Sequence, residues 1–178
     1  MHSRKRIRLL LCSLALLTCC QKADLTVEPD GMEEAHPVVG TGGGTAACPY
    51  TVTDVLGMDT LPNEAVWVIG YMVGTAPRAM SNAVFSPEAE NQSNILLASD
   101  SLCKDASQCI PIELSTEKNK LNFSLPTNAT HFGKCLLIEG TPSTYLYTKG
   151  LRKVSTGLWM DGFDISTVAP QEWGSIDI

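Results

Sequence analysis

Apolar and polar positions divide the chain into a short apolar run near its start and a longer stretch of brief apolar segments. The short run covers residues 7–17, and the segments follow one another after residue 49. Brief runs rich in β-branched and aromatic residues, with Gly, Pro, Asn, Asp or Ser between them, are typical of strands. The pattern predicts strands at 64–74, 94–98, 110–114, 120–125, 135–141 and 144–147. We therefore expect an all-β barrel or sandwich.

Four local signals add detail to this pattern. Thr51 or Thr53 is a suitable N-cap for one short helix that Gly57 would end. Gly70, inside the strongest predicted strand, indicates a bulge. A turn at 149–152 would close a hairpin, and the apolar positions 158–163 predict a last strand or a cover for the core.

The first residues have the pattern of an export signal. Arg4, Lys5, Arg6 and Arg8 form a basic cluster before and within the apolar run. The run is too short to span a bilayer, which takes about 20 apolar residues. A basic start, a short apolar run and small residues after it are typical of a secretory signal peptide.

The end of this run, Leu17-Thr18-Cys19-Cys20, resembles the lipobox of bacterial lipoproteins. The resemblance implies that residues 1–19 are removed and that Cys20 is lipidated, with Cys19 as the alternative. Residues 21–24 resemble the export tag of Bacteroidota surface lipoproteins. Because lasting anchoring takes more than one acyl chain, the several chains of a lipoprotein Cys would hold the protein at the outer membrane, on its periplasmic or surface side. A soluble secreted protein is the alternative.

The net charge of the chain restricts the classes of partner that it could bind. The chain has 13 Lys and Arg, 19 Asp and Glu, and a formal net charge of -6. The leader contains several of the bases and none of the acids, so the mature chain is more acidic still. Nucleic-acid binding needs a basic surface, and we expect none here. Anionic lipids of the membrane would also repel an acidic protein surface. The membrane anchor must therefore be the acyl chains attached to the protein, not its surface charge.

The composition of residues 20–48 predicts a flexible tether that is acidic and rich in glycine. Its Gly40-Thr41-Gly42 faintly resembles a dinucleotide-binding turn, but Pro49 interrupts the helix that such a turn requires. We expect the folded domain at 49–178, with its core at about 49–153 and a C-terminal extension after it.

The domain resembles an uncharacterised Bacteroidota family with an OB-like fold. The resemblance lies in residues 49–52, 66–74, 94–98, 110–114, 133–141, 145 and 150–152. The chain departs from the family at Cys48, where an acidic residue is usual, and at 128–131, which lacks the usual Asn-Pro. The resemblance implies a small closed or partly open OB-like barrel with one short helix, located in the cell envelope.

Four cysteines remain after the proposed lipidation site. Cys103 and Cys109 flank a polar loop and could form a disulfide outside the reducing cytosol. Cys48 and Cys135 are left as a weaker pair by elimination. A zinc site is less favoured, because no Cys-x-x-Cys occurs and His131 is the one imidazole nearby. We expect no metal and no cofactor.

Catalytic motifs are not evident. The mature chain keeps His36 and His131, without a nucleophile elbow or a zinc-protease motif. The carboxylates Asp100, Asp105, Glu113 and Glu139 are explained as surface groups. We expect a non-enzyme, with an envelope hydrolase as the remote alternative.

Aromatic residues are the candidate binding groups. Trp67 and Tyr71 share one strand face with Val73, which favours core packing. The candidates for an exposed surface that could stack on a glycan are Tyr145, Tyr147 and Trp159. Thr60 and Ser101 lie in Asp-Ser/Thr-aliphatic patterns that resemble O-glycosylation sites of Bacteroidota.

Together these features predict a lipid-anchored envelope protein whose domain is a non-catalytic binding module. Its partner would be an extracytoplasmic protein or a glycan. The principal alternative is a structural accessory subunit of an outer-membrane complex.

Overall fold

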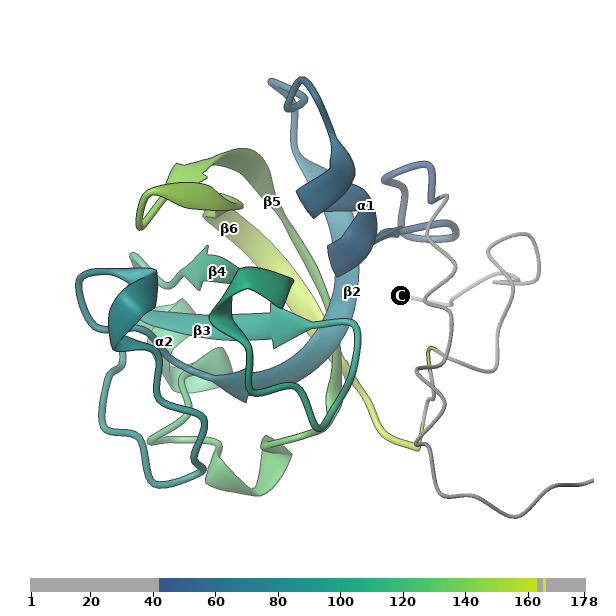
Figure 1. The fold of residues 1–178 in the computed structure, drawn as a ribbon. Helices are drawn as coiled ribbons and strands as arrows, with labels where there is room; N and C mark the ends of the chain where they lie inside the picture. Colours follow the sequence, from purple (N-terminus) through teal and green to yellow (C-terminus); the bar gives the residue numbers. More distant parts are fainter. Residues whose placement is uncertain (1–41, 163–164, 166–178) are drawn as a thin grey trace, which may run out of the picture. The chain divides into compact units, whose positions relative to one another are not determined.

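Six strands form one mixed sheet in the computed structural model, which describes residues 42–162 and Ile165 (Figure 1). The predicted signal peptide, Cys19, Cys20 and the tether as far as residue 41 lie outside the described residues. The strands are β1 (Tyr50–Thr51), β2 (Val66–Gly74), β3 (Asn94–Ala98), β4 (Cys109–Glu113), β5 (Cys135–Tyr145) and β6 (Thr148–Met160). Within the described part, no helix is long and apolar enough to cross a membrane.

The sheet returns on itself. Its strand order is β1-β2-β3-β4-β6-β5, and β2 also pairs with β5, so β2 to β6 form a ring. The pairs β1–β2 and β4–β6 are parallel, and the other pairs are antiparallel. The prediction of a mostly β structure is confirmed.

The β5–β6 hairpin differs from the prediction. The runs 135–141 and 144–147 were expected as separate strands with a turn at 149–152, but β5 continues to Tyr145 and β6 starts at Thr148. The turn is therefore Leu146-Tyr147, which contains none of the usual turn residues. β6 then runs to Met160, so the sheet extends past the expected core limit of 153.

The helices also differ from the prediction. Helix α1 (Val52–Gly57) forms as expected, with Thr51 and Asp54 in a capping box. The strand predicted at 120–125 is wrong, because α2 (Glu117–Phe123) occupies this segment. Thr116 caps the helix and accepts a hydrogen bond from the Asn119 backbone at 3.1 Å. One short helix was expected, whereas the described residues contain two α-helices and the 3-10 helices η1 (Met80–Asn82), η2 (Ala106–Gln108) and η3 (Ala129–His131).

Buried side chains form clusters on both faces of the strands. The inner cluster lies within the ring and includes Val68, Met72, Ile95, Leu97, Ile110, Ile112, Leu136 and Ile138. The outer cluster lies on the opposite strand face and includes Ile69, Tyr71, Val73, Leu96, Ala98, Cys109, Cys135 and Leu137. Because neighbouring strand residues point to opposite faces, burial of both faces explains why β3 is a continuous apolar run.

Two glycines allow close contacts between elements. A Cβ at Gly70 would lie 2.8 Å from the Val52 side chain of α1, so Gly70 makes room for the helix. The bulge expected there lies instead between Met72 and Gly74 in the pairing with β3. A Cβ at Gly150 would lie 2.4 Å from the Pro111 carbonyl oxygen, so this glycine lets β6 approach β4 where the ring closes.

The last residues of the predicted tether pack on the domain. The backbone N–H of Gly42 donates to Asp54 at 3.2 Å, and the N–H of Trp67 donates to the Gly44 carbonyl at 2.8 Å. Thr45 and Cys48 form an isolated β-bridge. Residues 42–48 thus belong to the folded domain, which begins before the expected boundary at 49.

Candidate binding surface

The tip of the β5–β6 hairpin has an unusual backbone. Leu146 and Tyr147 both have positive φ angles, 51° and 68°. Two-residue hairpin turns of the primed type require positive φ, and Asn-Gly is the usual sequence there because other side chains are strained. Strained residues of this kind persist where the surrounding structure holds them, and they are concentrated at functional sites.

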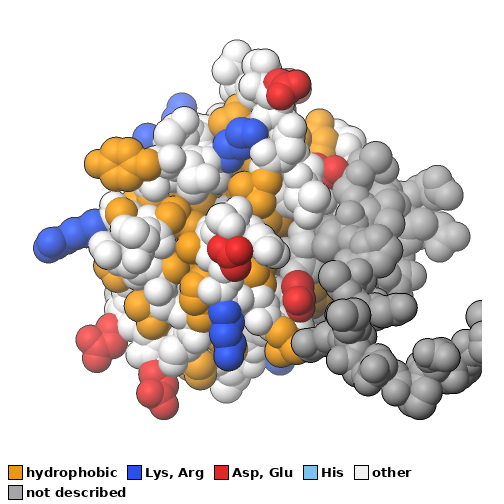
Figure 2. Space-filling view, in the orientation of Figure 1, with side chains coloured by type: hydrophobic (Ala, Val, Ile, Leu, Met, Phe, Trp, Pro, Cys, Tyr) orange, Lys and Arg blue, Asp and Glu red, His pale blue; other side chains and the backbone are white. Residues whose placement is uncertain are grey.

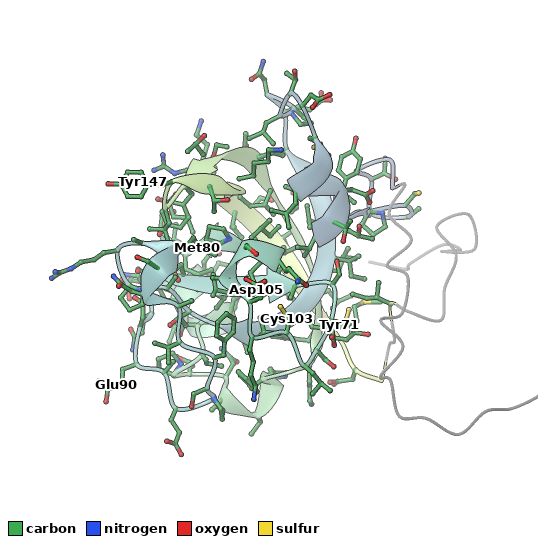
Figure 3. All side chains as sticks on the ribbon, in the orientation of Figure 1. Tyr71, Met80, Glu90, Cys103, Asp105 and Tyr147 are labelled. Atoms are coloured by element: carbon green, nitrogen blue, oxygen red, sulfur yellow. The ribbon has the colours of Figure 1, made fainter. Side chains whose placement is uncertain are left out.

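The two tip residues have opposite environments. Leu146 is half-buried and packs against the outer cluster. The Tyr147 side chain is 91% exposed and projects from the hairpin into solvent (Figure 3). The tip is thus anchored by one side chain and presents the other.

The hairpin is fixed to β4 by an ion pair. Arg152 on β6 donates to both carboxylate oxygens of Glu113, at 3.1 and 2.9 Å, and lies over the Tyr145 ring at 5.8 Å from its centroid. The hydrogen bond and charge of Glu113 raise the pKa of Arg152 above its usual value. Tyr145 is therefore a supporting residue below the tip.

A second contact joins the hairpin to α1. Lys149 Nζ donates to the carbonyl oxygens of Leu56 and Met58, at 2.6 and 2.5 Å. The last carbonyls of a helix carry partial negative charge, and α1 has no basic residue in its own last turn. Lys149 supplies that charge from β6 and fixes the hairpin on its second side.

Trp159, the third predicted surface aromatic, lies at the other end of β6. It is half-buried, stacks on His131 with ring centroids 4.2 Å apart, and donates to the Asn122 carbonyl at 3.2 Å. It pairs with Leu136 in the register, whereas Tyr145 pairs with Thr148 at the tip. Tyr145, Tyr147 and Trp159 thus do not form one platform. Trp67 and Tyr71 pack at the outer cluster, as predicted.

The outward face of β3 and β4 is covered by the segment between β2 and β3. Leu96, Ala98 and Cys109 on this face are at most 1% exposed. The Asn94 side chain accepts from the Ala76 N–H at 2.8 Å and donates to the Ala76 carbonyl at 3.0 Å, which fixes the start of the segment. Met80 from the segment packs against the outer cluster. No ligand can reach this face while the segment stays in place.

The Cys103–Cys109 loop brings two sulfurs together. Their Sγ atoms lie 3.8 Å apart, and each thiol donates to the Asp105 carbonyl, at 3.5 and 3.3 Å. Burial, followed by the neighbouring Cys103 and Asp105, raises the pKa of Cys109. Ser107 donates to the Asp105 carboxylate from both its backbone and its hydroxyl, which lowers the pKa of Asp105.

The weaker cysteine pair is separated along β2. Cys135 pairs with Tyr71. Cys48 is bridged to Thr45, next to the Gly44 carbonyl that accepts from Trp67. Tyr71 and Trp67 are about 13 Å apart along a strand that rises about 3.3 Å per residue. The structure therefore does not bring Cys48 and Cys135 together as a pair.

The other candidate residues lie apart from one another. Thr60 is exposed and Ser101 is half-buried, both in loops. The four carboxylates each take part in a separate contact: Asp100 with Leu102, Asp105 with Ser107, Glu113 with Arg152 and Glu139 with Ser155. Among residues 42–162 and Ile165, no group of three His, Cys, Asp or Glu could hold a metal ion.

The surface is shallow and mixed in charge. A hollow of about 420 Å³ beside α1 is lined by Tyr50, Thr53, Asp54, Gly57 and Met58. Figure 2 shows acidic and basic side chains scattered over the visible face rather than gathered into one patch. On this face the protruding hairpin tip is more distinctive than any hollow.

Residues 50–160 match a family described as a domain of unknown function, DUF6359. The chain belongs to this family. The DUF6359 match starts with β1 and ends with β6, so it covers the whole sheet, including the part of β6 beyond residue 153. No curated protein and no solved structure matches the chain.

Sequence reasoning missed the residues that support the hairpin tip. Lys149 contacts α1, and Arg152 contacts Glu113 across 39 positions of the chain. Neither contact leaves a local pattern that could have revealed it. Tyr147 was found, but as one of three aromatics rather than as the tip of a strained turn.

Proposed function

We propose that this DUF6359 protein is a lipid-anchored component of a bacterial cell envelope, and that its domain is a non-catalytic, OB-like module that binds an extracytoplasmic protein through the hairpin tip. The exposed Tyr147 on a turn with two positive φ angles carries the proposal. The acidic mature chain supports partners other than nucleic acid.

The topology supports the OB-like part of the proposal. OB folds are five-stranded, partly open Greek-key barrels. The ring of β2 to β6, the parallel β4–β6 pair and the position of α2 between β4 and β5 agree with such a barrel. We therefore interpret the ring as a small barrel, with β1 added at the edge of β2.

The position of the exposed groups selects the binding surface. OB folds commonly bind through one sheet face and the loops beside it. Here the β3–β4 face is covered, whereas the β5–β6 loop projects into solvent. A binding surface at the loop uses the part of the fold that stays open.

The shape of the tip favours a protein partner. A single protruding tyrosine can fill a pocket of another protein, and tyrosine is enriched among residues that dominate binding energy. A glycan platform would need aromatic rings side by side, and Trp159 lies at the far end of β6. A partner of this kind is compatible with either a binding module or an accessory subunit.

Site-specific photocrosslinking tests the proposed surface. A photoreactive phenylalanine analogue would replace Tyr147 in the full chain in its host, with the same analogue at Leu121 as the control. Leu121 is 64% exposed on α2 and is a matched exposed apolar position. We expect one discrete protein adduct from position 147 and none from 121. Excess wild-type domain should suppress the adduct, and excess Tyr147→Ala domain should not.

Other outcomes contradict the proposal. Equal labelling from positions 147 and 121, or equal competition by the Tyr147→Ala domain, would exclude the tip as the binding surface. A glycan-array signal that Tyr147→Ala removes, in the absence of a protein adduct, would replace the protein partner by a glycan.

The anchor requires its own test. Cys20→Ala should release the protein from carbonate-washed membranes, whereas Cys19→Ala should leave it in the pellet. Metabolic labelling with a palmitate analogue should follow the same pattern. Retention of Cys20→Ala in the membrane pellet would contradict the proposed lipid anchor.

A further inference from the structure

The loop between β3 and β4 contains two cysteines that the proposed binding surface does not use. The Sγ atoms of Cys103 and Cys109 are 3.8 Å apart, whereas a disulfide bond is about 2.05 Å long. Cys109 is the first residue of β4, and η2 lies between the two cysteines. The two sulfurs are therefore close enough for a bond with little change in the loop.

The loop already has a fixed conformation without that bond. The Cys103 N–H donates to the Asp100 carbonyl at 3.2 Å, and the Gln108 N–H donates to the Asp105 carbonyl at 3.1 Å. Ser107 donates to the Asp105 carboxylate through its backbone at 2.9 Å. These contacts fix the turn before Cys103 and the 3-10 turn before Cys109, and both thiols donate to the Asp105 carbonyl, so closing the disulfide orders few additional residues.

The two thiols differ in access to solvent. Cys109 is 1% exposed and belongs to the outer cluster, whereas Cys103 is half-buried at its edge. A bulky oxidant can therefore reach Cys103 but not Cys109. Burial also raises the pKa of Cys109, which disfavours its thiolate in the reduced protein.

We propose that Cys103 and Cys109 form a disulfide by exchange with an oxidised protein dithiol, and that the exchange starts at Cys103. The Cys103 thiolate attacks the donor disulfide, which forms a mixed disulfide and releases one donor thiolate. The Cys109 thiolate then attacks Cys103 Sγ, which forms the Cys103–Cys109 bond and releases the second donor thiolate. Two thiols are oxidised, the donor disulfide is reduced to a dithiol, and the two protons end on the donor.

The bond would stabilise the cover of the β3–β4 face. Met80 and Cys103 both pack against the outer cluster. Tying Cys103 to the first residue of β4 keeps this side of the cluster closed when the loop fluctuates. The disulfide thus belongs to the outer cluster and not to the hairpin tip.

Peptide mapping of the exported full-length protein tests the bond directly. Trypsin cleaves after Arg78, Lys104 and Lys118, so Cys103 and Cys109 fall in the separate peptides 79–104 and 105–118, each with one cysteine. After alkylation without reductant, we expect these peptides to be linked, and reductant should separate them. Cys48→Ser is the matched control and should leave the linkage unchanged. Two separate alkylated peptides, or a link from either of them to Cys135, would overturn the proposal.

The order of attack is tested on the purified, reduced full chain with oxidised glutathione. Cys109→Ser should accumulate a glutathione adduct at Cys103, and Cys103→Ser should accumulate about tenfold less at Cys109 because of burial. Cys109→Ala serves as a second variant if the serine is not tolerated. Equal adducts at the two positions would contradict the start at Cys103.

Oxidation of the purified wild-type chain by glutathione separates the disulfide from the proposed envelope location. A chain that stays in the cytosol would contradict the envelope proposal, while linked peptides from the wild-type chain oxidised in this way would still support the geometry. Failure of the purified chain to form the link would overturn the disulfide regardless of location.

Discussion

The inner and outer clusters use the same strands but are enclosed in different ways. Leu96 and Leu97 are neighbours on β3, and both are 0% exposed. Leu97 belongs to the cluster within the ring, to which α1 and α2 also contribute, whereas Leu96 points outward under the segment between β2 and β3. The two leucines are therefore equally buried but differently supported: the inner one packs among the ring strands and the two α-helices, and the outer one packs under loop residues such as Met80.

Truncation of these two leucines should give the largest effects. We expect Leu97→Ala to lower the free energy of unfolding by about 4 kcal/mol, and Leu96→Ala by about 2.5 kcal/mol. The loop segment can move into the outer cavity, and the ring cannot do so in the inner one. Urea unfolding measures both, with Leu121→Ala on the exposed face of α2 as the control. Equal losses for the two variants would contradict the comparison.

Release of the covering segment should have the next largest effect. Asn94→Ala removes both hydrogen bonds to the Ala76 backbone and leaves that buried backbone unsatisfied. We expect a loss of about 2 kcal/mol. Hydrogen exchange should accelerate in residues 75–92 and stay slow in the strands of the ring. Asn82→Ala, which removes an exposed contact to Pro77 in the same segment, is the control and should change little.

The pH dependence of stability gives a further test of burial in the outer cluster. The pKa of Cys109 is higher in the folded protein than in the unfolded chain. The contribution of this thiol to the free energy of unfolding is therefore fully present below the unfolded pKa of about 8.5. It is lost as the pH rises above that value, because the unfolded thiol ionises first. Stability of the reduced protein should fall by at most about 1.4 kcal/mol per pH unit there.

Urea unfolding between about pH 8 and 10, with and without reductant, checks this prediction. Oxidation of the pair, or Cys109→Ser in the reduced protein, should remove this pH dependence of the free energy of unfolding and thereby assign it to Cys109. A slope that survives Cys109→Ser would assign the titration to another group.

The smallest change in the free energy of unfolding should come from the hairpin tip, which lies outside the interior of both clusters. Tyr147→Gly should raise the free energy of unfolding by about 0.5–1 kcal/mol, since glycine accepts the positive φ without strain. Tyr147→Ala keeps a Cβ and should be nearly neutral. Thermal unfolding measures the change, and both variants should lose the photocrosslinking partner in competition. Destabilisation by glycine would mean that the ring itself supports the turn.

The sequence predicted those elements whose signals are local. β3 has the predicted bounds, because its apolar run is continuous and has turn residues on both sides. Helix α1 was predicted from a cap at Thr51 or Thr53 and the stop at Gly57, and the structure has its cap at Thr51. The strand predicted at 120–125 rested on the alternation of Leu121, Phe123 and Leu125, whereas the structure forms α2 there with Thr116 as its N-cap.

The errors at the hairpin have a non-local cause. Gly150 was interpreted as a turn residue, yet it is glycine because β6 passes close to the Pro111 backbone. The actual turn, Leu146-Tyr147, contains no turn residue and is set by the paired strands on either side. The contacts of Arg152 and Lys149 likewise depend on the closed ring, so the candidate site could be predicted only as a set of exposed aromatics.

The packing of residues 42–51 has a mechanical consequence. The chain enters the domain through Gly42, whose N–H donates to Asp54, and then runs as β1 parallel to β2. Tension applied through an N-terminal anchor would load these few hydrogen bonds before it reached the ring. Residues 42–51 would then separate from the domain, while the ring remained intact. If the proposed lipid anchor holds the chain at a membrane, residues 42–51 would therefore yield to tension before the ring does.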